Sequence, residues 1–192
     1  MKNILKNRWA LSTVVTTLII LVVSVLLAGV VTYFAINVTS TRVQEESLHL
    51  TKQHVWYDAD GEVSQAAIMI INTGGRDVVI DKLTVRGQEV AWEAVSPSTQ
   101  CVHYALTTES VSEDLEFQTT VAGAEPVTGI TLIDAGNDLT LPSGQTMLVY
   151  IVSPDSITIN DIGLTVAITV FTSQAMYYKE TNVQAYIASG SP

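Results

Sequence analysis

Apolar residues fill the start of the chain. Arg8 and Arg42 flank a run without any charged residue, and most of its side chains are aliphatic. A run this long exceeds the roughly 20 residues with which a helix spans a bilayer. A helix also satisfies its backbone hydrogen bonds internally, as a segment in lipid must. The pattern therefore predicts a membrane helix near the N-terminus.

The sequence stays compatible with a helix beyond the apolar run. Arg42 and Glu46 are four residues apart, a spacing at which opposite charges support an exposed helical turn. A helix from Leu11 to Ser47 would be roughly 55 Å long, whereas the hydrocarbon core of a bilayer is about 30 Å thick. We expect one helix over residues 11–47 whose outer half stands clear of the membrane.

From Leu48 onward, short alternating runs replace the helical pattern. Leu48, Leu50 and Trp56 fall on one parity, which predicts a strand with these side chains on one face. Two apolar, β-branched runs follow at residues 63–72 and 78–87, with a Gly-Gly turn between them. Such a pair predicts a β-hairpin.

Strand patterns continue toward the C-terminus. Residues 101–107 indicate a short strand, and the acidic, Ser- and Thr-rich stretch 107–126 indicates a long loop with one strand around residues 115–121. The clearest alternation places an apolar residue at every second position: Ile162, Leu164, Val166, Ile168 and Val170. About eight strands without a second amphipathic helix predict an α+β chain, in which one long hydrophobic helix precedes an antiparallel immunoglobulin-like β-sandwich over residues 48–192.

The charges are distributed unevenly along the chain. The net charge is −10; Lys2, Lys6 and Arg8 precede the apolar run, and all 19 acidic residues follow Arg42. Flanks rich in Lys and Arg stay on the cytoplasmic side of a membrane, so we expect the N-terminus inside and the acidic domain outside. An acidic exterior repels nucleic acid, which excludes DNA binding.

The residues leading into the helix resemble the class III signal of archaeal type IV pilins and archaellins. The similarity lies in Lys6-Asn7-Arg8-Trp9-Ala10-Leu11-Ser12-Thr13, where a basic leader opens directly onto the aliphatic run. An ordinary secretory signal is cut after its apolar region instead. The resemblance implies that a prepilin peptidase removes residues 1–10 by cutting between Ala10 and Leu11. Val15 stands where bacterial type IV pilins carry Glu, so the resemblance is to the archaeal family.

The resemblance implies a structural subunit of an archaeal type IV pilus-like extracellular filament. The precursor would lie in the cell membrane with a cytoplasmic N-terminus, and the assembled filament would serve adhesion or surface attachment. Implied partners are the membrane, the prepilin peptidase, an ATP-driven assembly machine and further copies of this chain. The residues expected in the filament core are Leu18, Leu21, Val23, Leu26, Leu27, Val30 and Phe34.

A second function fits the same pattern. A bitopic membrane protein that never polymerises could present a single extracellular sandwich for binding a ligand or an S-layer. The apolar helix is common to both interpretations, so both stay open at the level of the sequence.

No motif for catalysis or for a cofactor stands out. The histidines His49, His54 and His103 lack metal-ligand spacing, and a Gly-x-Ser-x-Gly elbow is absent. We therefore expect no enzymatic activity and no cofactor. Cys101 is the only cysteine, so it is either a small buried apolar residue or the site of an intersubunit disulfide.

Two further residue sets are candidate sites. Asp58, Asp60 and Glu62 resemble the start of a calcium loop, but the Glu that would close such a loop is missing. A plain turn is the main interpretation, with weak calcium binding as the alternative. Asn37 begins the chain's only Asn-x-Thr sequon; a glycan there would keep that face of the helix from packing.

Overall fold

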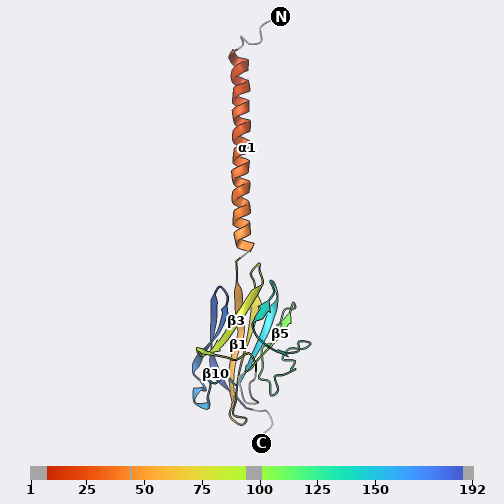
Figure 1. Ribbon diagram of the computed structural model, residues 1–192, viewed down its shortest axis with the longest axis vertical. Helices are drawn as coiled ribbons and strands as arrows, with labels where there is room; N and C mark the ends of the chain where they lie inside the picture. The colour runs from red at the N-terminus through yellow and green to blue at the C-terminus, as the bar shows by residue number, and fades with distance from the viewer. Residues whose placement is uncertain (1–7, 44, 94–100, 188–192) are drawn as a thin grey trace. The chain divides into compact units, whose positions relative to one another are not determined.

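The computed structural model describes residues 8–43, 45–93 and 101–187, with helix side chains described from residue 12 to residue 40. The chain forms two compact units, Met1–Gln44 and Glu45–Pro192. The first unit contains one helix, α1 (Arg8–Val43) (Figure 1). The second unit contains the strands and is called the β-domain below.

Helix α1 ends earlier than the expected Ser47. Residues 45–47 belong to the β-domain, because Glu46 Oε1 accepts a 2.6 Å hydrogen bond from the Thr172 hydroxyl and the Ser47 carbonyl accepts the N–H groups of Thr73 and Gly74. Residues 45–47 have no regular secondary structure, and these contacts hold them against the β-domain just before its first strand. Glu46 therefore bonds to the β-domain in place of the expected helical pair with Arg42, whose side chain lies outside the described residues.

The described part of the β-domain contains ten strands. They are β1 (Leu48–Asp58), β2 (Val63–Asn72), β3 (Val78–Val85), β4 (Gln88–Glu89), β5 (Cys101–Thr107), β6 (Ile133–Asp134), β7 (Leu139–Leu141), β8 (Thr146–Val152), β9 (Thr165–Thr172) and β10 (Met176–Tyr186), with the short 3₁₀ helix η2 (Ile159–Asp161) between β8 and β9.

The strands hydrogen-bond in the order β4-β3-β9-β10-β1-β2-β8-β5-β6, and β7 pairs with β3. Only the β1–β10 pair is parallel among the described strands. One N-terminal helix followed by a large, mostly antiparallel sheet confirms the α+β class.

A large apolar core lies between the two halves of this sheet. One half, β1, β2, β8 and β5, contributes alternate residues such as Ile68 and Val149. The other half, β3, β7, β9 and β10, contributes residues such as Ile80 and Ile168. All four of these side chains are fully buried. The predicted alternation in β9 is confirmed at its last three apolar positions, whereas Ile162 and Leu164 precede the strand and are partly exposed.

A second apolar core lies on the opposite face of β2 and β8. The segment 108–132, called the covering segment below, packs Leu115 and Val121 onto this face, against strand residues that include Met69 and Tyr150. The expected strand around residues 115–121 is wrong, since these residues have no strand conformation. Their apolar side chains pack onto the sheet from a segment that is not itself a strand. Strands β2 and β8 are therefore buried on both faces.

The expected hairpin between residues 63–72 and 78–87 is also wrong. Strand β2 pairs with β1 and β8, whereas β3 pairs with β4, β7 and β9. The Gly-Gly turn carries the chain from one half of the sheet to the other. With both edges occupied by other strands, β2 offers no edge to β3.

A β-bulge in β1 overturns the expected position of Trp56. The register with β2 shifts between Thr51 and His54, and Lys52 has a φ of 52°. The extra residue reverses the parity of everything that follows. Leu48 and Leu50 therefore face the large core, while Trp56 faces the second core.

Candidate functional site

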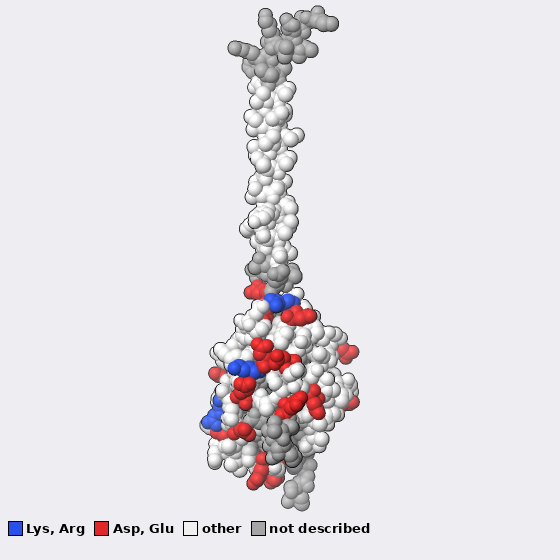
Figure 2. Space-filling model, viewed as in Figure 1, with Lys and Arg blue, Asp and Glu red and all other residues white. Residues whose placement is uncertain are grey.

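Helix α1 exposes apolar side chains around its whole circumference. Every residue from 12 to 40 is exposed, and Figure 2 shows this stretch without a charged side chain. The residues expected in a filament core are all more than half exposed: Leu18, Leu21, Val23, Leu26, Leu27, Val30 and Phe34. An apolar surface of this extent requires cover from lipid or from other proteins.

Four polar side chains of the apolar stretch bond within the helix itself. The hydroxyls of Thr16, Ser24 and Thr32 each donate to the carbonyl four residues earlier, at 2.7–2.9 Å. Thr17 donates to the carbonyl of Val14. Such bonds leave these hydroxyls satisfied in a medium without water. Residues Ser12–Ser40 meet the length and hydropathy expected of a membrane-spanning helix.

The helix is longer than a bilayer requires. Its 36 residues correspond to about 54 Å, compared with a hydrocarbon core of about 30 Å. If the bilayer covers the first 20 residues or so after Arg8, the apolar side chains of Val31, Phe34 and Ile36 project beyond it. All three are exposed by more than half.

The predicted processing site and sequon both lie on this helix. Ala10 and Leu11 fall within α1, but their side chains lie outside the described ones. Asn37 is exposed near the C-terminal end of the apolar stretch. Cleavage and glycosylation stay predictions.

The acidic cluster at the β1–β2 turn has a structural role. Asp58 Oδ1 accepts the backbone N–H of Asp60 at 3.1 Å, an Asx turn that closes the connection between the strands. The described residues hold no group of three His, Cys, Asp or Glu side chains placed to bind a metal ion. Asp58, Asp60 and Glu62 thus lie near one another in sequence without converging on a common point.

The structure brings together three side chains that sequence analysis did not connect. Cys101 Sγ lies 3.2 Å from His103 Nε2, and His103 Nδ1 lies 2.7 Å from Asp134 Oδ1. Cys101 and His103 are two residues apart on β5, so their side chains share a face. Asp134 comes from the neighbouring strand β6, a partner that sequence spacing does not reveal.

The order of thiol, imidazole and carboxylate matches that of cysteine hydrolases, but its electrostatics differ. Burial raises the pKa of the Cys101 thiol, and the negative charge of Asp134 raises it further. A thiolate is the nucleophilic and metal-binding form of cysteine, so Cys101 stays in its unreactive form at neutral pH. His103 Nδ1 also lacks an aligned hydrogen bond despite the short distance. The three side chains link β5 to β6, and the expectation that the chain is not an enzyme stays a prediction.

A second His–Asp pair fastens the covering segment. His54 Nε2 lies 3.1 Å from Asp114 Oδ1, and the His54 ring stacks on Trp56 with centroids 5.1 Å apart. Burial alone would raise the pKa of Asp114, but the hydrogen bond to His54 and the N–H of Leu115 lower it overall. The bulge in β1 creates this pair because it turns His54 toward the covering segment.

No family model and no curated protein sequence matches the chain. Among solved structures, the chain is similar to the ligand-binding region of serine-glutamate repeat protein A (SgrA) of Enterococcus faecium. The identity is 15% and the TM-score 0.28, over 74% of this chain and 98% of that one. A TM-score this low does not establish a common fold.

Proposed function

We propose that this chain is the structural subunit of an archaeal type IV pilus-like extracellular filament, used for adhesion or surface attachment. In this proposal α1 anchors the precursor in the cell membrane and later packs against copies of itself in the filament core. A prepilin peptidase would remove the leader, and an ATP-driven machine would extract the subunit from lipid. The β-domain, as an immunoglobulin-like sandwich enclosing one main core, would face outward.

One observation carries the proposal: the apolar surface of α1 is longer than a bilayer is thick. A membrane-anchored monomer would leave side chains such as Phe34 and Ile36 in water. Each large apolar side chain gains roughly 1.5–3 kcal/mol on burial. A bundle of identical helices covers the whole length, and contacts that do not close into a ring generate a fibre. The non-polymerising membrane protein leaves this outer surface without cover.

Charged substitutions at two depths test the proposal. Val23→Glu would place an unpaired carboxylate in the middle of the apolar stretch, at a cost of several kcal/mol in lipid and in a bundle alike. Ile36→Glu lies about 12 Å beyond the residues that the bilayer covers, so this variant should still insert but should fail to pack. Ile187→Glu is the matched control, because Ile187 is 79% exposed in the β-domain.

Negative-stain microscopy with immunolabelling of the β-domain gives the readout, and membrane fractionation reports insertion. We expect labelled filaments in wild-type cells and in Ile187→Glu cells, and membrane-bound protein without filaments in Ile36→Glu cells. Uniform membrane labelling without filaments in the wild type would instead favour the bitopic binding protein. Normal filaments in Ile36→Glu would contradict the proposed role of the outer helix.

A further inference from the structure

Strand β5 has an open edge over its last three residues. On one side β5 pairs with β8 along its whole length. On the other side the two-residue strand β6 pairs only with His103 and Tyr104. Ala105, Leu106 and Thr107 therefore have a strand neighbour on one side alone.

The segment before β6 is prevented from covering this edge. Leu132 donates its N–H to Ala124 at 2.8 Å, and Ile130 donates to Val127 at 2.9 Å. The turn at residues 127–130 includes Gly129 with a φ of 81°, a conformation that glycine adopts without strain. These bonds pull the segment back onto itself, so a gap is left beside β5.

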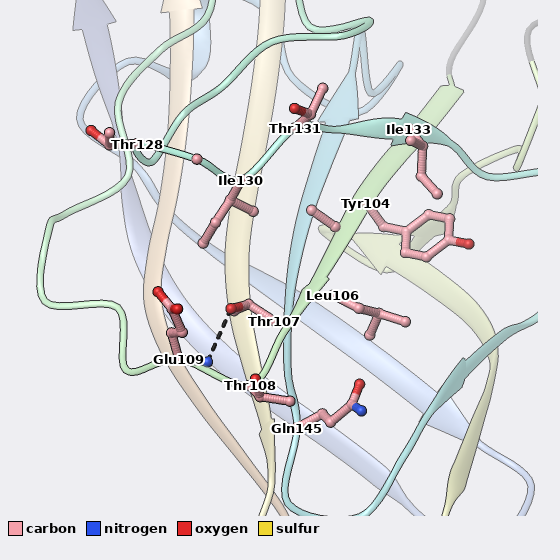
Figure 3. A pocket seen from close by; sticks show the side chains of 12 residues that line it. Tyr104, Leu106, Thr107, Thr108, Glu109, Thr128, Ile130, Thr131, Ile133 and Gln145 are labelled. Carbon is pink, nitrogen blue, oxygen red and sulfur yellow. Dashed lines mark hydrogen bonds between the residues drawn. The ribbon is translucent and has the colours of Figure 1, made fainter.

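The gap is a groove of about 710 Å³ that extends over both faces of the β5 edge (Figure 3). Tyr104 and Leu106 line it from one face of the strand, and Thr107 lines it from the other. Leu106 and Ile133 are 41% and 53% exposed and form an apolar wall.

The polar lining of the groove is almost uncharged. Glu109 is its one charged side chain, in a domain whose acidic residues far outnumber its basic ones. The remaining polar lining consists of hydroxyls and an amide, from Thr107, Thr108, Thr128, Thr131 and Gln145. The Thr107 hydroxyl accepts the backbone N–H of Glu109 at 3.0 Å, which holds the backbone of Glu109 beside the end of β5.

We propose that this groove binds a neutral oligosaccharide. Hydroxyl, amide and carboxylate groups match the many hydroxyls of a sugar, each of which both donates and accepts. The Tyr104 ring and the apolar wall of Leu106 and Ile133 suit the C–H faces of sugar rings. This inference rests on the attachment role proposed above and names its ligand class, but it does not depend on polymerisation.

The length of the free edge favours a sugar over an added peptide strand. Three residues of strand span only about 10 Å, whereas strands usually have five or six residues. Strand β6 occupies the preceding positions of β5 and stops an added strand from extending there. The hydrogen-bonding groups of the groove come mainly from side chains, which a sugar can reach without a long paired edge.

The test uses the full chain in lipid nanodiscs, with empty discs as the blank. The probes are cellohexaose, chitohexaose, maltohexaose and mannohexaose, and a Thr-Val-Thr-Val-Thr-Val peptide serves as a strand mimic. Saturation-transfer NMR detects binding, and titration gives Kd. Leu106→Arg fills the groove and Gln145→Ala removes its amide. Tyr178→Ala is the matched control, since Tyr178 is a 60% exposed aromatic residue on β10.

We expect at least one hexasaccharide to bind the wild type and the Tyr178→Ala variant equally, and both groove variants to bind about tenfold more weakly, or about 1.4 kcal/mol. Absence of binding by all four sugars at roughly millimolar Kd would overturn the inference. So would sugar binding that both groove variants retain, or peptide binding that displaces the sugar. Negative-stain microscopy of cells that express the wild type separates the two proposals. Sugar binding by a protein that forms no filaments would contradict the proposed polymerisation and leave the sugar site standing.

Discussion

Asn72 connects three segments of the β-domain through one buried amide. Its Nδ2 donates to the carbonyls of Arg76 at 2.8 Å and Leu141 at 3.1 Å, and its Oδ1 accepts the N–H of Gly74. The side chain is almost fully buried. It therefore fixes the turn that carries the chain from β2 to the other half of the sheet, a role that the Asn-Thr-Gly sequence alone does not reveal.

Asn72→Ala should lower the free energy of unfolding by on the order of 3 kcal/mol, because two carbonyls and one N–H lose their partner in a buried site. Urea denaturation of residues 45–192 measures the effect. Asn182→Ala is the matched control, since Asn182 is exposed on β10 and its loss should cost less than about 0.5 kcal/mol. Equal effects of the two substitutions would show that the buried amide contributes nothing specific.

Asp161 makes the stability of the β-domain depend on pH. The hydroxyl and N–H of Thr158 donate to its Oδ2, Arg86 donates to its Oδ1 at 2.7 Å, and these bonds lower the pKa of the Asp161 carboxyl. A lowered pKa contributes stability above the unfolded value of about 3.9. That contribution disappears as the pH falls through the folded value.

Asp161→Asn should therefore lower the melting temperature at pH 7, and the difference from wild type should shrink as the pH falls below about 4. Thermal unfolding followed by circular dichroism across this range measures it. A difference that stays constant with pH would mean that ionisation of Asp161 does not stabilise the fold.

At the scale of elements, residues 45–47 work as part of the β-domain although they precede its first strand. Gly74 packs so closely against them that a Cβ would lie 2.7 Å from the carbonyl oxygen of Glu45 and 2.8 Å from the N of Ser47. This contact and the bonds from Glu46 and Ser47 hold residues 45–47 against the β2–β3 turn and the end of β9. The boundary between the units therefore falls before Glu45 and not at Leu48.

A fragment from Glu45 to Pro192 should be soluble, monomeric and rich in β-structure, since the proposed assembly element is removed with α1. A fragment that begins at Leu48 should unfold at lower urea concentration, because it lacks the Glu46–Thr172 bond and the Ser47 carbonyl. Circular dichroism, sedimentation and urea denaturation compare the two. Equal stability would show that residues 45–47 are dispensable, and appreciable helix content in either fragment would contradict the fold.

At the scale of the whole molecule, the maturation of the chain separates the two functions considered. If the class III signal is used, N-terminal peptide mass spectrometry of native protein should find Leu11 as the first residue. Ala10→Phe should block the cut, because the peptidase must accommodate the residue next to the scissile bond. A dominant peptide that contains Lys6 would point to an unprocessed membrane anchor.

Local sequence patterns predict the helix and strands of this chain better than they predict which strands pair with one another. The strand at β9 and the helix at α1 follow from side chains that repeat within one segment. The alternation of residues predicts the wrong face for Trp56, because it does not reveal the single bulged residue near Lys52. Sequence spacing does not reveal the site around Cys101, because Asp134 comes from a strand 33 positions further along the sequence.

The sequence by itself determined that the chain begins with a helix whose apolar run, between Arg8 and Arg42, carries no charge, and continues into an acidic β-domain. Both properties depend on side chains close together in the sequence. Only the tertiary structure decided that β2 pairs with β1 and β8, that the covering segment buries the second face of the sheet, and that the edge of β5 stays open. Strand pairing joins residues far apart in the sequence, and its outcome depends on all competing edges at once. The groove beside β5 exists because the backbone N–H groups of Leu132 and Ile130 donate to Ala124 and Val127 and not to β5. A local sequence pattern does not predict these partners.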